Sequence, residues 1–533
     1  MSTPLVELSG ARAAVLGRLW GALCREPLPQ VVARESVAGE TVVTLVDGRR
    51  LVGPAEAGVP FAVCRSGLTV TLGGVGYNDP ERLAAGLGWP GRVRAELADS
   101  VANLALSRTA PPPRLPASAA RDLAGGRGTA PGSDAGPGPG ATRRNDGGPG
   151  PVTGGHPGSG SGSAPGAPTP WYPSDLVDLE ARVVDGHPLH PLCRTRTGMS
   201  AAEQVRFGPE FSPTVGLELV RVRAADWVGV GDWPWREGAD YLLPVHPWQR
   251  EHVWAGAEVA GSLEARPLMS LRTLVLRDGW HVKTAVSVQM TSAMRTVSAA
   301  SVRNGPALSA LVGSLTGLEV LAEPAAGSVG GDRERAAVLR AGPVAGAGEW
   351  VCAVSALCAG PDPLVVGLAG ADPVGWVSAL VDAVLPPLLA LLTVGVALEA
   401  HGQNTLVVLR DGRPVRGVYR DFGGVRVSPA LLARHRIDCP PLFGDVESDD
   451  PAVLRAKFVS SALSTMFAEV VAVLARGTGV SPRLLWWPVA QALSGHPGLV
   501  RGPWPMKALM TMRLAADPLE DVWAWVPSPV ATL

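Results

Sequence analysis

Three Asp-Gly pairs, each between two apolar runs, constrain the fold of this chain more than any other feature. They are Asp47-Gly48, Asp278-Gly279 and Asp411-Gly412. Both residues of such a pair tolerate positive φ, which a two-residue β-hairpin turn requires. We therefore expect antiparallel hairpins distributed along the chain and combined with helices, which is an α+β fold.

The length and one biased tract predict the domain organisation. A chain of 533 residues exceeds what one ordinary core supports, so several domains are expected. Residues 110–170 are rich in Gly, Pro and Ser, cannot bury enough apolar surface to fold, and are predicted to form a disordered insertion without chemistry. The ordered regions are then an N-terminal segment at 1–109, a middle region at 171–372, and a C-terminal region at 373–533 that ends in helices.

Composition and charge exclude several classes of protein. The net charge is −1, so no overall basic field attracts nucleic acid. The six cysteines form no CxxC pair, which argues against structural zinc or a disulfide framework. The N-terminus lacks a signal-peptide pattern, and charged residues and a Pro-Pro pair interrupt the apolar stretch 376–400, which predicts a buried helix. We expect a cytoplasmic protein without a membrane partner.

Polar residues gather around the third Asp-Gly turn, in the stretch "EAHGQNTLVVLRDGRPVRGVYRDFGG" from Glu399 to Gly424. Asn404 precedes the first strand of the predicted hairpin and Asp421 follows the second, so both lie at the same end. An amide oxygen and a carboxylate are ligands suited to Mg²⁺, with nucleotide phosphates completing the shell. The structural alternative is a helix-capping Asn and a hairpin-end Asp.

A second cluster lies in "KTAVSVQMTSAMRT". Lys283 is flanked by apolar residues in a predicted strand, where a lysine is costly unless its charge is paired. Thr291 and Ser292 are expected to open a helix, with Arg295 one turn in, which would form an anion site. The alternative is an edge-strand lysine and a surface arginine.

A proline-stiffened loop, "GHPLHPLCRTRTG", carries His187, His190, Arg194 and Arg196. Two histidines without a third ligand favour hydrogen-bonding supports over a metal site. "PVHPWQ", which contains His246, is interpreted as a packed tryptophan beside a satisfied histidine, and Ser270 is interpreted as part of a turn.

A small-molecule kinase is the alternative from another class. Asp421-Phe422-Gly423, one hairpin after an Asn-containing loop, is typical of its ATP–Mg site. A kinase also needs a carboxylate as base two residues after the loop histidine, where this chain has Gln403. Sequence patterns of serine hydrolases, P-loop proteins and Rossmann proteins do not occur.

In their order along the chain, these motifs resemble the NRPS-independent siderophore synthetases of the aerobactin-synthetase (IucA/IucC) type. The resemblance covers about residues 175 to 515 and ends in "MKALMTMRL", which is similar to the C-terminal lysine motif of the family. It implies a cupped-hand fold with thumb, fingers and palm. One departure is Arg194, where the family usually has lysine.

The resemblance also implies a reaction. ATP with Mg²⁺ activates citrate or a related carboxylic acid as an acyl adenylate, and an amine, hydroxylamine or alcohol then forms an amide or ester with release of AMP. Such a ligase would serve siderophore biosynthesis and iron acquisition. Which carboxylate and which nucleophile react stays open, and a homodimer is an expectation of the resemblance.

Position by position, the resemblance assigns roles to residues of this chain. The residues expected to contact ATP are Ser270, Lys283, Arg295, His190 and Arg194. The residues expected to hold Mg²⁺ are Asn404 and Asp421, with Glu399 as a further candidate. The residues expected around the reacting carboxylate are Thr291, Arg295, His401, Gln403 and Lys507.

Overall fold

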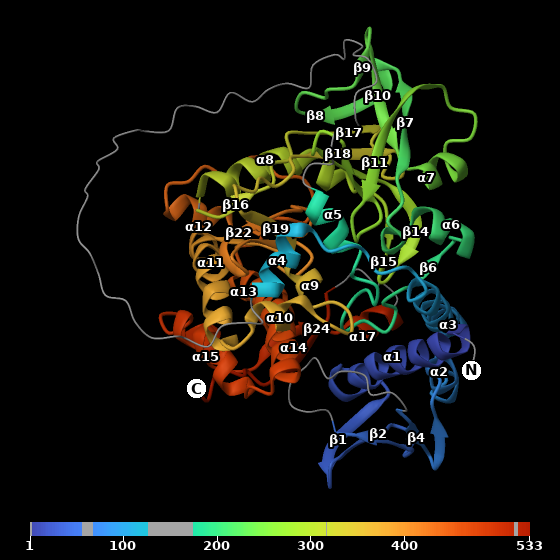
Figure 1. The fold of residues 1–533 in the computed structure, drawn as a ribbon, viewed down its shortest axis with the longest axis vertical. Coiled ribbons are helices and arrows are strands. Elements are labelled where there is room, and N and C mark those ends of the chain that lie inside the picture. Colours follow the sequence, from blue (N-terminus) through green and yellow to red (C-terminus); the bar gives the residue numbers. More distant parts are fainter. Residues whose placement is uncertain (1–2, 56–67, 126–173, 316, 516–520) are drawn as a thin grey trace, which may run out of the picture.

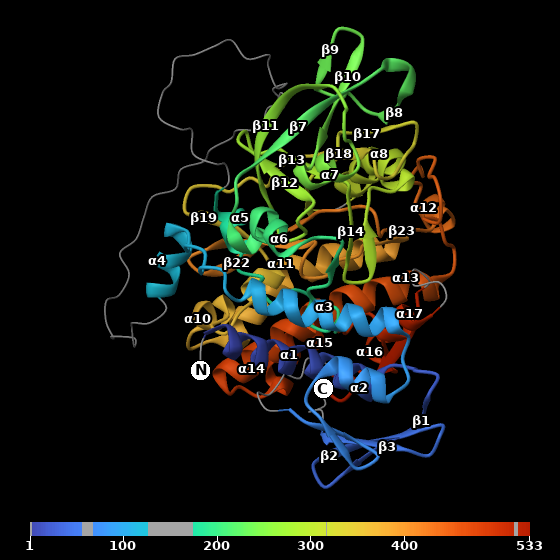
Figure 2. The same cartoon turned by 90° about the vertical axis from the view of Figure 1, so that its right-hand side faces the viewer.

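The computed structural model describes residues 3–55, 68–125, 174–315, 317–515 and 521–533. The N-terminal sheet and the largest sheet lie at opposite ends of the molecule, and the C-terminal helices lie between them (Figures 1 and 2). The sheets are antiparallel except for the pairing of β16 with β22, and helices cover them. The predicted α+β class is confirmed.

The N-terminal lobe packs helix α1 against α3 above a five-stranded sheet. Its core contains Leu16, Leu19 and Leu23 of α1, all fully buried. Leu192 and Met510 enter the same core, so the lobe is tied to later segments of the chain. The elements are α1 (Thr3–Arg25), β1 (Val31–Val37), β2 (Glu40–Leu45), β3 (Arg50–Pro54), β4 (Val70–Leu72), β5 (Val75–Tyr77), α2 (Pro80–Gly86) and α3 (Gly91–Ser107).

The largest sheet has nine strands in the order β8-β17-β18-β13-β12-β11-β7-β10-β9. Its two central strands form the hairpin predicted at Asp278-Gly279. Helix α8 (Ala299–Leu315) packs on β17 and β18. The strands are β7 (Val215–Val222), β8 (Trp227–Val230), β9 (Arg236–Glu237), β10 (Asp240–Val245), β11 (Val259–Pro267), β12 (Thr273–Leu276), β13 (His281–Thr284), β17 (Ala325–Val329) and β18 (Ala336–Arg340).

Two smaller sheets lie next to the largest one. One has the order β15-β14-β6 and the other β16-β22-β21-β19, which contains the hairpin predicted at Asp411-Gly412. Because β16 and β19 precede residue 372, the predicted boundary at 372/373 cuts through this sheet and is wrong as a structural division. The strands are β6 (Arg196–Thr197), β14 (Val286–Met290), β15 (Ala293–Arg295), β16 (Glu319–Val320), β19 (Glu349–Ala353), β21 (Thr405–Arg410) and β22 (Arg413–Tyr419).

The C-terminal region is mainly helical, as expected. Helix α11 continues through its Pro386-Pro387 pair and buries one face, which includes Trp376 and Leu380. Helices Pro373–Val394 and Pro451–Thr478 have the length and hydropathy of a membrane span, with 44% and 83% of their most apolar windows buried in protein. The main helices are α11 (Pro373–Val394), α12 (Pro429–Arg434), α13 (Pro451–Phe458), the π-helical η3 (Val459–Phe467), α14 (Ala468–Thr478), α15 (Pro482–Ala492) and α17 (Leu509–Leu514). Short strand pairs join β20 (Val396–Ala397) to β23 (Arg426–Val427) and β24 (Trp504–Lys507) to β25 (Trp523–Val526).

The prediction of disorder over residues 110–170 is wrong for its first part. Helix α4 (Ala117–Gly125) packs on the largest core, where Ala119 is fully buried. The Asp122 carboxylate accepts hydrogen bonds from the Trp350 indole at 2.7 Å and from the Gly412 backbone N–H at 2.8 Å. A few anchoring contacts therefore order a segment whose composition is too poor in large apolar residues to predict a fold. Residues 126–173 lie outside the described residues.

Removing the Asp122 carboxylate should destabilise the protein, because Asp122→Ala leaves two donors in this contact without their acceptor. The expected loss in unfolding free energy is about 2 kcal/mol, the usual cost of unsatisfied buried donors. Urea denaturation followed by circular dichroism measures this loss. Asp122→Asn is the matched control, since it keeps an acceptor oxygen and should lose less. Equal stability of wild type and Asp122→Ala would contradict the anchoring role of α4.

Candidate active site

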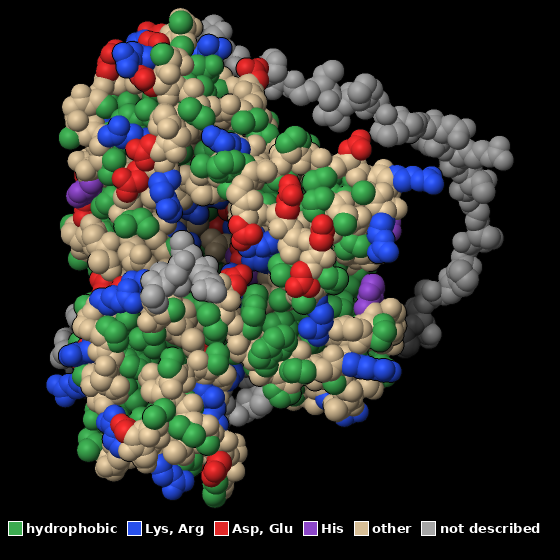
Figure 3. Space-filling view, turned by 180° about the vertical axis from the view of Figure 1, so that it is seen from behind, with side chains coloured by type: hydrophobic (Ala, Val, Ile, Leu, Met, Phe, Trp, Pro, Cys, Tyr) green, Lys and Arg blue, Asp and Glu red, His purple; other side chains and the backbone are tan. Residues whose placement is uncertain are grey.

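A cavity of about 710 Å³ brings most of the predicted site residues together. Its walls come from the histidine loop at 186–196, strands β12 to β15, the loop before β21, the end of β22, the π-helical segment and Lys507. From behind, the molecular surface is hollowed between the lobe of the nine-stranded sheet and the rest of the protein, beside Lys and Arg side chains (Figure 3). The cavity therefore lies where the lobes meet.

An ion pair between Lys283 and Asp421 lies in this cavity. The ammonium group of Lys283, 5% exposed and in the centre of the nine-stranded sheet, lies 2.9 Å from both oxygens of the Asp421 carboxylate. Arg340 on the neighbouring strand lies 3.4 Å from the same carboxylate and also pairs with Glu323 at 2.6 Å. Burial opposes ionisation of Asp421, but the surrounding cations outweigh it and hold its pKa well below its ordinary value. The carboxyl is therefore an anion.

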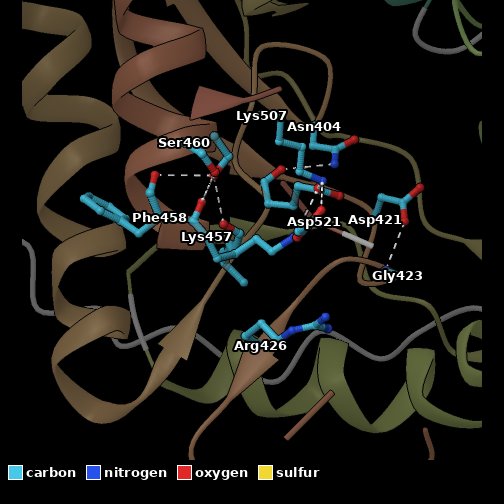
Figure 4. A network of polar contacts seen from close by, with 12 residues as sticks. Asn404, Asp421, Gly423, Arg426, Lys457, Phe458, Ser460, Lys507 and Asp521 are labelled. Carbon is cyan, nitrogen blue, oxygen red and sulfur yellow. Dashed lines mark hydrogen bonds and ion pairs between the residues drawn. The ribbon is translucent and has the colours of Figure 1, made fainter. Parts of the chain in front are cut away.

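The predicted convergence of Asn404 and Asp421 is confirmed. Thr405 pairs with Tyr419 across the hairpin, and the Arg420 N–H donates to the Asn404 carbonyl at 3.0 Å. The Asn404 side-chain amide donates to the Glu399 carbonyl at 3.2 Å, and no donor among the described residues contacts its side-chain oxygen. That oxygen and the carboxylate lie at one end of the hairpin (Figure 4). Their role as metal ligands stays a prediction.

The segment around Thr291 corrects one prediction. Thr291 and Ser292 do not open a helix, because they form the turn between β14 and β15. Thr291 has a φ of 54°, in the left-handed region that a tight turn uses. Ser and Thr favour turns as well as helix starts, so the sequence pattern did not distinguish the two. No helix N-terminus supplies an anion site here.

Two arginines near the ion pair add positive charge to the cavity. The guanidinium of Arg295, at the end of β15, has no hydrogen bond or ion pair with any residue that the structure describes, and the residue lines the cavity half-buried. Burial, together with the nearby Arg295, lowers the pKa of Arg272 to about 10, so Arg272 stays charged at neutral pH. The guanidinium of Arg272 donates to the Thr296 carbonyl. This part of the cavity therefore carries more positive than negative charge.

The three histidines in the cavity are held in the neutral form. Burial lowers the pKa of His187 to about 3 and lowers those of His190 and His401. Each Nδ1 accepts a backbone N–H, at 3.2 Å from Leu189 for His187 and at 3.3 Å from Gln403 for His401. A neutral imidazole that accepts at Nδ1 carries its proton on Nε2. All three rings are therefore fixed as Nε2–H donors, and that of His190 lies 2.8 Å from the Ser292 hydroxyl.

A second charged cluster surrounds Glu399. Its carboxylate lies 3.3 Å from the ammonium group of Lys457 and 3.2 Å from that of Lys507. Asp521 lies 3.2 Å from Lys507, and Figure 4 shows the two lysines beside it. Burial opposes ionisation of Glu399, yet both lysines draw its pKa well below the usual range. Sequence analysis missed Lys457 and Asp521, since neither lies in a recognisable motif.

The Arg194 guanidinium and the Gln403 backbone carbonyl both bond to other residues of the protein. The Arg194 guanidinium donates to the carbonyls of Val183 and Val184 and lies 3.6 Å from Glu210. This arrangement favours a structural role for Arg194 over the expected contact with ATP. The Gln403 carbonyl accepts from Arg420 at 2.8 Å, and the residue still lines the cavity.

The cationic side chains and oxygen ligands of the cavity fit a nucleoside triphosphate with a divalent cation. Lys283 and Arg295 supply positive charge for phosphates, and Asn404 and Asp421 supply oxygen ligands. A Cβ at Gly424 would lie 2.1 Å from a Glu399 oxygen, so a side chain there would displace the Glu399 carboxylate. Ser270 lines the same cavity and accepts the Thr273 N–H at 3.3 Å.

Comparisons of sequence show similarity to siderophore synthases. The model of the IucA / IucC family matches residues 175–359, and the model described as ferric iron reductase FhuF-like transporter matches residues 375–498. Staphyloferrin A synthase of Staphylococcus aureus is 27% identical over 356 residues, or 56% of this chain and 61% of that protein. Aerobactin synthase of Escherichia coli is 26% identical over 336 residues, or 47% of this chain and 56% of that protein. The chain thus matches little more than half the length of these relatives.

Comparisons of structure agree. The petrobactin biosynthesis protein AsbB from Bacillus anthracis superposes with a TM-score of 0.74 at 17% identity, covering 99% of this chain and 96% of that one. ATP-bound aerobactin synthetase IucA from Klebsiella pneumoniae gives 0.70 at 18% identity, covering 98% and 99%. The chain has the fold of the NRPS-independent siderophore synthetases. In sequence, its residues 175–359 match the IucA / IucC family.

The neutral histidines predict a pH dependence of stability. His187 has a pKa of about 3 in the folded protein and an ordinary value of 6.5, so the unfolded chain binds more protons between these values. Its contribution to the unfolding free energy is therefore lost as the pH falls below 6.5, by up to about 1.4 kcal/mol per pH unit.

His187→Asn should remove that contribution while keeping an acceptor for the backbone N–H groups. Urea denaturation between pH 7 and pH 5 should give a shallower decline for this variant than for wild type. His435→Asn, at an exposed position, is the matched control. Parallel curves for wild type and His187→Asn would show that the His187 ring is not held neutral.

Proposed function

We propose that the chain is an ATP-dependent siderophore synthetase of the cytoplasm, which activates a carboxylate and joins it to a nucleophile. A carboxylate oxygen of citrate or a related acid attacks the α-phosphorus of ATP, and pyrophosphate leaves. An amine, hydroxylamine or alcohol then attacks the acyl adenylate and gives an amide or ester, AMP and a proton. The activities named for staphyloferrin A synthase and aerobactin synthase support this proposal.

One observation carries the proposal: a cavity with excess positive charge also holds an ionised carboxylate and an amide oxygen to which no described residue donates a hydrogen bond. Because a carboxylate oxygen is already nucleophilic, the first step needs charge neutralisation and positioning rather than proton abstraction. A kinase needs a base where Gln403 stands, and an amide does not take up a proton. The relatives are named as synthases, so the kinase alternative has no support.

In this proposal, different residues of the cavity bind the phosphates, the metal ion and the reacting carboxylate. Lys283, Arg295 and Ser270 hold the phosphates, and Asn404 and Asp421 hold Mg²⁺. The metal supplies Lewis-acid neutralisation of the phosphate oxygens. The groups assigned to the reacting carboxylate are Thr291, Arg295, His401, Gln403 and Lys507.

Exchange of labelled pyrophosphate into ATP, with a panel of carboxylates that includes citrate, tests the first step. Wild type should exchange label with at least one carboxylate, and Asp421→Asn should lose the exchange because it removes the anionic metal ligand. Asp445→Asn is the matched control, at a side chain that is 90% exposed. Near-normal exchange in Asp421→Asn, with an unchanged melting temperature, would remove the metal assignment.

His401→Ala separates binding from chemistry. The Nε2–H of the neutral ring is proposed to orient the carboxylate and stabilise charge as the adenylate forms. Turnover should therefore fall by on the order of 10²-fold, while ATP affinity changes little because other residues hold the phosphates. Calorimetric ATP binding and AMP formation are measured on the same preparation. If both fall together with thermal stability, His401 is structural.

A further inference from the structure

One wall of the cavity has no role in the mechanism above. It is formed by the π-helical segment η3 and the start of α14, and it presents Ser460, Ser461, Thr465 and Glu469 to the cavity. π-Helical segments are rare and occur frequently at functional sites. Ser461, Thr465 and Glu469 are spaced four residues apart, which places them along one face of the helix. We call these four residues the acceptor wall.

The hydroxyl groups of the acceptor wall have already used their protons. Ser460, labelled beside Lys457 in Figure 4, donates to the Lys457 carbonyl at 3.2 Å. Ser461 donates to the same carbonyl at 2.7 Å, and Thr465 donates to the Ser460 carbonyl at 2.6 Å. A hydroxyl has one proton and two lone pairs. These oxygens therefore offer only lone pairs to a ligand in the cavity.

Glu469 adds a carboxyl that has no partner in the described part of the chain. It is half-buried in the first turn of α14, and no donor or cation lies within bonding distance of its oxygens. Burial raises the pKa of Glu469 to about 8, while Arg18 of α1 and Arg476 of α14 act from farther away to lower it. Arg18 is itself bonded to the carbonyls of His187 and Asp185. At neutral pH such a carboxyl is mainly protonated in the free protein, and a bound ammonium group favours its ionised form, so the site is suited to a cationic ligand.

Other walls of the cavity have the reverse chemistry. Lys283, Arg272 and Arg295 are suited to phosphates, and the histidines are fixed as donors. We therefore expect the anionic groups of the substrates to lie beside these residues. Lys507 and Lys457 are balanced by Glu399 and Asp521, so they leave Glu469 unpaired.

We propose that the acceptor wall binds a second, protonated amino group of the nucleophile, with Glu469 as its counter-ion and Ser461 and Thr465 as acceptors. An ammonium group has three N–H donors and no acceptor, which matches a wall of acceptors and one carboxylate. The nucleophile is then a diamine or an amino-acid-like amine, of which one nitrogen is acylated and the other stays charged. This inference rests on the proposed synthetase reaction and selects one class among its three kinds of nucleophile.

The inference predicts a specific dependence on the second amino group. AMP formation is measured with the best carboxylate from the exchange assay, using 1,3-diaminopropane, 1,4-diaminobutane and 1,5-diaminopentane against propylamine, butylamine and pentylamine. Wild type should use the best diamine with a kcat/KM at least tenfold above that of the matching monoamine. Glu469→Gln should reduce this ratio to about one through a higher KM, because the amide keeps the size of the side chain but not its charge.

Pyrophosphate exchange in Glu469→Gln should stay within twofold of wild type, since the first step does not involve the nucleophile. Glu251→Gln, at an exposed glutamate outside the cavity, is the control and should keep the diamine preference. The inference is overturned if wild type shows no diamine preference or if the preference survives in Glu469→Gln. If pyrophosphate exchange occurs but diamines are not preferred, only this inference is contradicted. If no carboxylate supports pyrophosphate exchange, the proposed function is contradicted as well.

Discussion

The ion pair of Lys283 and Asp421 is the contact on which the site depends. It joins the centre of the nine-stranded sheet to the end of the β21–β22 hairpin, two segments 138 residues apart in the chain. Burying a lysine in a strand is costly unless a counter-charge reaches it. The same contact then fixes where Asp421 lies relative to Asn404 and Arg340. One interaction therefore offsets the cost of burying Lys283 and also positions the proposed metal ligand Asp421.

Local rules predicted the parts of the site that one hairpin brings together. A two-residue Asp-Gly turn fixes the register, and the register places Asn404 beside Asp421. The apolar surroundings of Lys283 in the sequence likewise indicated a charge that required a partner. The order of the motifs along the chain predicted the overall fold, which the structural comparisons confirm.

Contacts between distant segments were beyond such rules. Lys457 reaches Glu399, and Asp521 reaches Lys457 and Lys507, only when α13 and the C-terminal strands pack together. Glu469 lies in no recognisable motif, and its significance comes from the absence of a partner for its carboxyl among the described residues. Composition wrongly predicted disorder at α4, where Asp122 anchors a segment with few large apolar residues. Local preferences failed at Thr291, since the same residue types favour a turn and a helix start.

The central claim is that this cavity activates a carboxylate with ATP and does not transfer a phosphoryl group to a hydroxyl. The nucleotide formed in a complete reaction tests it most directly, because adenylation yields AMP and kinase chemistry yields ADP. Incubation with ATP, Mg²⁺, a carboxylate panel and a nucleophile, followed by chromatography of the nucleotides, should show AMP and pyrophosphate in equal amounts. Formation of ADP with transfer of the γ-phosphate to the substrate would contradict the account.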